Sequence, residues 1–218
     1  MLRIMRGEIL GKSCSDNNDV TLTAIFESWH IGDGTYPPLH RGQQVNLSFE
    51  MEAAEMSLSA PGGSSLVHEG GAQYRFTGEV LRLYNENGSD AITVIEAAGF
   101  RFYVNRSFGL QTGEWVQGHG KLVLDHYIWV ENLDEYKDAP DLFYQLRVAH
   151  LHAIRTPERF INRHAKGKSL PCSLPPDSYG PEDMTELESM EGQPFDEEFY
   201  LIDLTDQGLG VPVARTFT

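Results

Sequence analysis

Two stretches of the chain share a pattern of strands and turns at a constant offset of 71 residues. Residues 5–53 align with residues 76–124, and seven of these 49 positions are identical. The identical pairs are Gly7/Gly78, Glu8/Glu79, Leu10/Leu81, Asp19/Asp90, Leu39/Leu110, Gly42/Gly113 and Val45/Val116. A repeat at fixed spacing predicts two units of one kind. Chance similarity between two strand-rich stretches is the alternative.

Each unit has the pattern of short strands joined by polar turns. Residues 15–19 and 85–90 are rich in Asn, Asp, Ser and Gly, which favour tight turns. A β-branched run follows each turn, at 20–25 and at 92–95. Every second residue from 45 to 51 is apolar, as in a strand with one buried face.

We therefore expect a mainly β fold built from two small barrel-like or sandwich-like units, at 1–60 and 72–132. An oligonucleotide-binding-type barrel is one candidate topology for each unit. Gly118 and Gly120 stand at alternate positions of one strand. Such glycines indicate a bulge or a sharply bent barrel strand.

A third segment, 133–168, combines a long strand with a basic helix. Period two places seven side chains of the strand on one face, namely Leu142, Tyr144, Leu146, Val148, His150, His152 and Ile154. Thr156-Pro157-Glu158 is a typical helix start. We expect residues 169–218 to form an acidic loop with a returning C-terminal strand.

The charge is concentrated in this last segment. Between residues 169 and 214 there are eleven acidic residues and no lysine or arginine, against a net charge of −15 for the whole chain. Nucleic-acid binding requires cations that neutralise phosphates, so this balance argues against an exposed nucleic-acid surface. A basic protein partner fits it better, because complementary fields speed association and select partners.

The preferred functional hypothesis is a non-catalytic binding protein, such as an inhibitor or immunity-type protein for a basic partner. The loop 29–38 carries two aromatic anchors beside an Asp-Gly turn, although a simple hairpin that caps the barrel is the favoured explanation. The candidate partner-binding residues are Trp29, Tyr36, Glu182, Asp183, Glu186, Glu188, Asp196, Glu197 and Glu198.

A second hypothesis places an anion site on the basic helix. Arg155, Arg159, Arg163 and Lys166 are spaced to share one helical face. The acidic tail would then mask this patch, and the chain would bind nucleic acid or another anion only when the tail is displaced. A solvated basic face is the simpler interpretation.

A third hypothesis is a metal-dependent hydrolase or ligand-binding enzyme of barrel type. His150 and His152 can present two metal ligands from one strand face, with His119 and His126 as further candidates. Histidines in a partly buried β-face are the alternative. The sequence contains no nucleophile elbow, P-loop, dinucleotide fingerprint or kinase signature, so we expect no cofactor and favour a non-enzymatic role.

The chain is expected to be cytoplasmic. Its first residues lack an apolar run of signal-peptide length, and no stretch approaches the length of a membrane-spanning helix. Cys14 and Cys172 are isolated, so we expect two reduced thiols, with a disulfide between them as the alternative.

Overall fold

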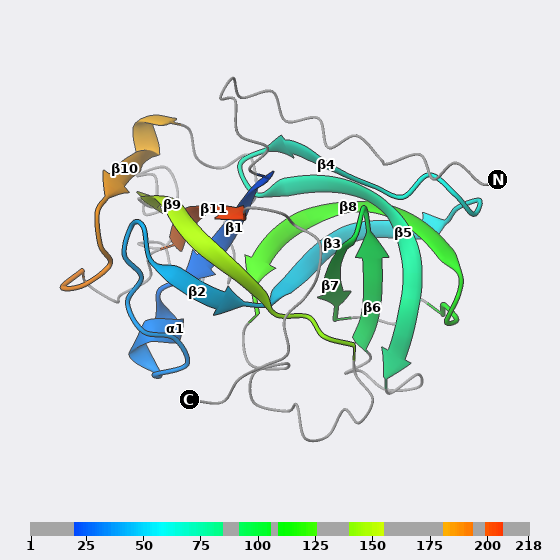
Figure 1. Ribbon diagram of the computed structural model, residues 1–218. Coiled ribbons are helices and arrows are strands. Elements are labelled where there is room, and N and C mark those ends of the chain that lie inside the picture. The colour runs from blue at the N-terminus through cyan, green and yellow to red at the C-terminus, as the bar shows by residue number, and fades with distance from the viewer. Residues whose placement is uncertain are drawn as a thin grey trace, which may run out of the picture.

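The computed structural model describes residues 20–84, 92–105, 109–125, 140–154, 181–193 and 199–206. Within these ranges, eleven strands form one connected sheet, with two short helices (Figure 1). The strands are β1 (Val20–Glu27), β2 (Gln44–Leu47), β3 (Phe49–Leu58), β4 (Ser65–Gly70), β5 (Gln73–Tyr84), β6 (Ile92–Ala97), β7 (Phe100–Val104), β8 (Trp115–Leu124), β9 (Tyr144–Ile154), β10 (Met184–Leu187) and β11 (Phe199–Asp206). The helices are α1 (Trp29–Gly32) and a 3-10 turn at Pro181–Asp183.

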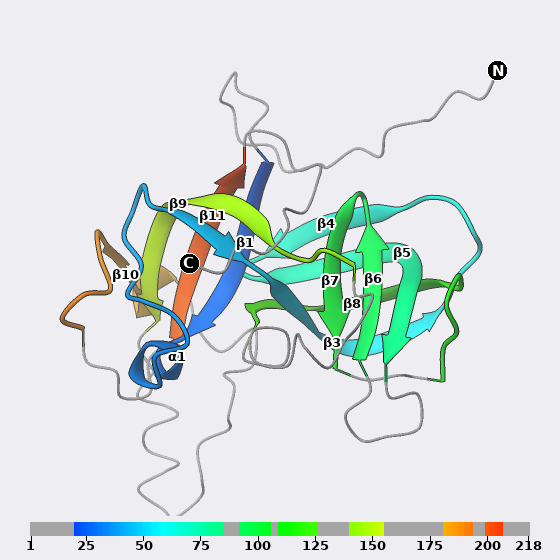
Figure 2. The ribbon, with the colours of Figure 1, turned by 60° about the horizontal axis from the view of Figure 1, so that its bottom comes forward.

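Five strands close into a barrel. β8 pairs antiparallel with both β3 and β5, β5 pairs with β6, and β6 pairs with β7. The ring closes where β7 meets β3 in a parallel pairing of Glu50 with Tyr103. We call β3, β5, β6, β7 and β8 the barrel, and β4 lies beside it on β5. Figure 2 shows these strands together on the right.

The other strands continue this sheet beyond the barrel. β1 joins β8 through a parallel pairing of Ile25 with Val123, and β11, β9 and β10 follow in that order. β2 pairs with the first residues of β9 and continues into β3 after Ser48. We call β1, β2, β9, β10 and β11 the flanking sheet, which Figure 2 shows on the left with α1.

One hydrophobic core runs through both parts. Phe76 and Phe102 pack edge to face inside the barrel, with ring centroids 5.1 Å apart. Phe100 of β7 stacks on Tyr144 of β9 at 4.8 Å, which ties the barrel to the flanking sheet. Each such ring contributes roughly 2 kcal/mol by leaving water, so the two parts stabilise each other.

The prediction of a mainly β chain is confirmed, and five of the strands form one closed barrel. The prediction of two repeated units is not confirmed. At an offset of 71, β1 aligns with β6. However, β6 is one of the barrel strands, whereas β1 belongs to the flanking sheet. Of the helices in the described residues, none has the length and apolarity to cross a membrane.

The irregularity expected near Gly118 and Gly120 lies in the strand opposite them. The pairing of β3 with β8 shifts register between Ala53 and Glu55. A Cβ atom on Gly120 would come within 2.6 Å of the backbone oxygen of Glu52. Glycine is therefore required on β8 because the bulged backbone of β3 approaches it so closely.

Candidate functional site

A β-bulge in β9 decides where its two histidines point. In β9, the even-numbered side chains fill the core up to Val148. After Val148, the odd-numbered side chains of Leu151 and Ala153 fill it instead. The faces change because the pairing of β9 with β11 passes over Ala149. One extra residue in a strand moves every later side chain to the opposite face. The expectation of a single face from Leu142 to Ile154 is therefore wrong.

His150 and His152 lie instead on the outer face of the flanking sheet. Their rings are nearly parallel, at 25°, with centroids 6.2 Å apart. Glu186 of β10 is directly opposite His152, and Asp203 of β11 is directly opposite His150. The Asp203 carboxylate accepts a hydrogen bond of 2.7 Å from the Thr23 hydroxyl. We call His150, His152, Glu186 and Asp203 the histidine cluster.

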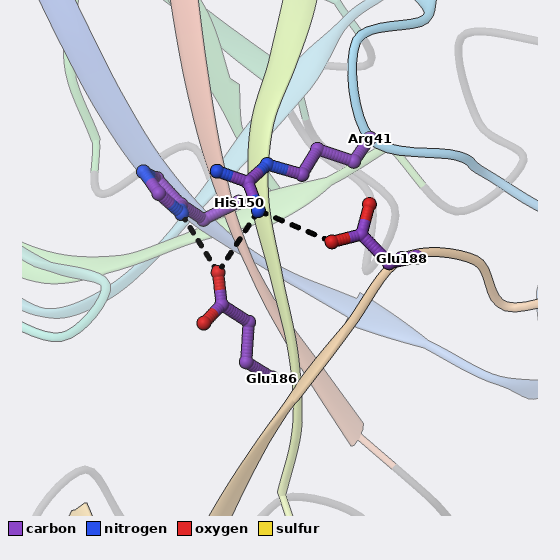
Figure 3. Close-up of polar contacts among 4 residues, drawn as sticks. All are labelled: Arg41, His150, Glu186 and Glu188. Carbon is purple, nitrogen blue, oxygen red and sulfur yellow. Dashed lines mark hydrogen bonds and ion pairs between the residues drawn. The ribbon is translucent and has the colours of Figure 1, made fainter.

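Glu186 is the centre of the polar contacts (Figure 3). His150 Nδ1 lies 3.2 Å from Glu186 Oε1. Arg41 Nη1 lies 3.4 Å from the same oxygen and 3.2 Å from Glu188 Oε1. All four side chains are well exposed, so water screens these ion pairs, and each contributes little to folding stability.

Arg41 reaches this position because its loop is fixed to the segment that follows β10. The Arg41 backbone N–H donates to the carbonyl of Glu188 at 2.9 Å. The N–H of Met190 donates to the carbonyl of Leu39 at 2.9 Å. Leu39 and Met190 are both buried in the core. The loop before β2 thus holds a guanidinium beside the acidic segment.

The electrostatics of the cluster keep its carboxylate ionised. The hydrogen bond from His150 lowers the pKa of Glu186, and the nearby charges of Arg41 and His152 lower it further. The Nδ1 atom of His152 is buried and has no hydrogen-bond partner among the described residues. Buried polar atoms normally have a hydrogen-bond partner, so this nitrogen is an exception to that rule.

The acidic residues predicted for partner binding fall into two groups. Glu182, Glu186 and Glu188 are exposed, and Asp183 is half-buried and takes part in an interaction. The other predicted residues lie outside the described ranges. They are Asp196, Glu197 and Glu198, together with the predicted anion site of Arg155, Arg159, Arg163 and Lys166.

The two aromatic candidates lie close together but differ in exposure. Trp29 is 38% exposed, and its indole N–H donates to the carboxylate of Glu27. Tyr36 is only 9% exposed and packs edge to face on Phe26 and His30. Tyr36 is therefore a core residue in this structure, which corrects its assignment to a partner-binding surface.

A second polar cluster, missed by the sequence reasoning, lies where the barrel closes. Tyr103 donates its hydroxyl hydrogen to Asp125 Oδ1, and Ser48 Oγ lies 3.0 Å from Asp125 Oδ2. Glu50, Ser48 and Asp125 are buried. Burial raises the pKa of Glu50 to about 8, with added repulsion from Glu52 and Asp125.

The ammonium group of Lys121 adds one positive charge to this region. Lys121 is buried, and its Nζ atom pairs with Glu52 Oε2 at 2.8 Å. The cluster lies between strands, among apolar side chains such as Val123. We interpret it as a structural element of the closing seam. The alternation of apolar and acidic residues at the start of β3 could have indicated this cluster from the sequence, because Glu50 and Glu52 occupy the strand face opposite Met51.

Among the described residues, the histidine cluster beside Arg41 and Glu188 is a solvent-accessible group of titratable side chains. In the part of the chain that the structure describes, no group of three or more His, Cys, Asp or Glu side chains could hold a metal ion. Comparisons with protein-family models, curated proteins and solved structures gave no match.

Proposed function

We propose that the chain is a binding protein without catalytic activity, whose acidic segment recognises a basic partner. The observation that carries this proposal is the exposed row of acids in residues 181–193. That segment contains five acids and no lysine or arginine. Four of the five are exposed, namely Glu182, Glu186, Glu188 and Glu191.

The acidic row has a fixed geometry, which favours selective binding. β10 pairs with β9 through four residues, and Arg41 holds two of the carboxylates. A prearranged set of charges loses less conformational entropy on binding than a flexible tail. β10 also lies at one end of the strand order, on the rim of the flanking sheet. A partner can approach it from the side.

The charge of the whole chain supports the same proposal. A net charge of −15 repels other acidic molecules and attracts basic surfaces at long range. An inhibitor or immunity-type protein for a basic toxin or nuclease uses such complementarity to associate rapidly. The partner class is therefore a protein with a lysine- and arginine-rich surface.

Charge reversal at matched positions tests this proposal. The variant Glu182→Lys/Glu188→Lys and the control Glu55→Lys/Glu69→Lys change the net charge equally. All four positions are exposed, and the control positions lie on β3 and β4. Basic proteins from the cell of origin should be captured at low salt by the wild type and the control but not by the first variant. Equal capture by both variants would refute the proposal.

A second candidate function is an anion or nucleic-acid binder masked by its own acidic segment. It is supported by the ion pairs that Glu186 and Glu188 make with Arg41. The variant Glu186→Gln/Glu188→Gln unmasks that cation without removing a strand. It should gain salt-sensitive binding to single-stranded nucleic acid if this candidate is right, and no binding if it is wrong.

We also infer a duplicated origin for the scaffold, in a different arrangement from a tandem repeat. Support comes from a second ring of pairings, from β8 through β1, β11, β9 and β2 into β3. Like the barrel, this ring has one parallel pair and shares β3 and β8. In this scheme β1 corresponds to β7 and β9 to β5, as in a circular permutation.

A further inference from the structure

We propose that Trp29 and Glu27 form a binding site for one lysine or arginine side chain of the basic partner. The proposal rests on the proposed function for the class of partner, and it adds a contact outside the acidic segment 181–193. The site lies where β1 ends and α1 begins.

Trp29 presents aromatic surface to the solvent. Among the described residues, Trp29 and Leu58 are the large hydrophobic side chains that are exposed, and Trp29 keeps 38% of its surface accessible. Tryptophan is enriched among the residues that dominate protein–protein binding, because its large ring excludes much water on contact. The exposed part of this indole is therefore a candidate contact for a partner.

The indole is held in a fixed orientation. Its ring centroid lies 4.0 Å from that of His30, with the two ring planes tilted by 31°. His30 is completely buried and packs against Phe26 and Tyr36. On its edge, the indole N–H donates a hydrogen bond of 2.5 Å to Glu27 Oε2. A side chain that is already fixed loses little conformational entropy when a ligand binds it.

The chemistry of the pair selects a cation. The faces of an indole carry negative potential, and tryptophan is the best aromatic partner for an ammonium or guanidinium group. The Glu27 carboxylate places a negative charge at the edge of the same ring. A carboxylate accepts about four hydrogen bonds, so Glu27 can receive an N–H group of the ligand and retain the indole. An apolar ligand would instead desolvate this charge without compensating it.

The local charge favours the same ligand. Residues 20–40 contain two acids, Glu27 and Asp33, and no lysine or arginine. Asp33 is exposed, and its backbone N–H donates to the Trp29 carbonyl at 2.9 Å, so a second carboxylate lies one helical turn from the indole. The next cation along the chain, Arg41, is paired with Glu186 and Glu188. A ligand cation therefore meets a negative local field.

The position of this site suits a partner that also contacts the acidic segment. Figures 1 and 2 both show α1 and β10 on the side of the flanking sheet away from the barrel. The loop that follows α1 continues to Leu39 and Arg41, whose backbones bond to Met190 and Glu188. A broad basic surface can therefore supply one cation to Trp29 and others to the acidic segment.

NMR titration of the ¹⁵N-labelled full-length protein with N-acetylarginine amide tests the proposal at constant ionic strength. The indole N–H signal of Trp29, identified by its absence in Trp29→Phe, should shift in a saturable manner. N-acetylcitrulline amide has nearly the same shape but no charge, and it should cause no such shift. Followed by the backbone amide signals of α1, binding should weaken about fivefold in Trp29→Leu, which lacks the aromatic face. Glu27→Gln keeps an acceptor for the indole but removes the charge, and it should weaken binding similarly.

Two controls separate this site from other effects. Leu58→Ala removes the other exposed large hydrophobic side chain, and Glu182→Lys/Glu188→Lys alters only the acidic segment. Both should bind the arginine derivative as the wild type does. Absence of a saturable shift, an equal shift with the citrulline derivative, or unchanged affinity in Trp29→Leu and Glu27→Gln would overturn the proposal. Because no protein partner is added, each of these results is distinct from failure of the capture experiment that tests the proposed function.

Discussion

Glu50 occupies the position at which the barrel closes. It is the residue of β3 that pairs with Tyr103 of β7, and it also pairs with Val123 of β8. Its carboxyl group is buried near Asp125 and Glu52, with Glu27 as a further acidic neighbour. An ionised Glu50 would therefore place one more negative charge in a seam that holds few cations.

We predict that this carboxyl makes the protein less stable as pH rises. The pKa of Glu50 is about 8 in the folded state and 4.5 as the ordinary value. A raised folded-state pKa gives stability that is complete below about pH 4.5 and lost as pH rises through 8. The full effect is roughly 5 kcal/mol at most, from 1.36 kcal/mol per pH unit. Chemical denaturation between pH 5 and pH 9 measures it.

The variant Glu50→Gln isolates this contribution. Glutamine resembles the protonated carboxyl in shape but cannot ionise, so the variant should be more stable than wild type at pH 9. The exposed Glu55 lies on the same strand, and Glu55→Gln should keep the wild-type pH profile. Parallel pH profiles for wild type and Glu50→Gln would show that Glu50 does not titrate in this range.

At the scale of single elements, the bulge in β3 predicts the effect of enlarging Gly120. A methyl group there would lie 2.6 Å from the Glu52 oxygen and 2.8 Å from the Cα atom of Ala53. Gly120→Ala should destabilise the fold by roughly 1–3 kcal/mol, a typical cost of overpacking. Gly32 has open space around it, so Gly32→Ala should change stability by less than about 1 kcal/mol. Thermal unfolding compares the two, and equal midpoints would contradict the close approach.

The bulge in β9 gives a second prediction for an element. Deleting Ala149 would remove the extra residue and turn His150 and His152 toward the core. The resulting burial of imidazoles should destabilise the protein by more than roughly 3 kcal/mol. Ala149→Ser keeps the residue count and should cost less than about 1 kcal/mol. Denaturant unfolding measures both, and a deletion as stable as wild type would show that the bulge is dispensable.

Local patterns predicted the strands well but not their arrangement. The β-branched runs and the alternation from Val45 to Met51 indicated β1, β2 and the start of β3, because these signals come from neighbouring residues. The bulge at Ala149 has no local signal, since it arises from pairing with β11 some fifty residues later. Arg41 and Asp203 also lie beside the histidines because of contacts between distant segments, and no local pattern indicates these contacts. Their proximity is a property of the sheet.

For the whole molecule, the position of β11 links the acidic segment to folding. β11 lies between β1 and β9, and Tyr200, Ile202 and Leu204 are completely buried. Three such side chains contribute roughly 6 kcal/mol by burial, comparable with the total stability of a typical domain. The C-terminal part of the chain is therefore structural as well as acidic.

We predict that a chain ending at residue 198 does not fold, although it retains all five barrel strands. The truncation removes β11, which leaves β1 and β9 without their shared neighbour and exposes the core between them. Near-ultraviolet circular dichroism should lose its tertiary signal, and thermal unfolding should lose cooperativity. Tyr200→Phe retains the ring and should unfold cooperatively, which distinguishes a missing strand from a missing hydroxyl. A cooperative transition in the truncated chain would show that the barrel folds alone, and the acidic segment could then be studied by deletion as well as by substitution.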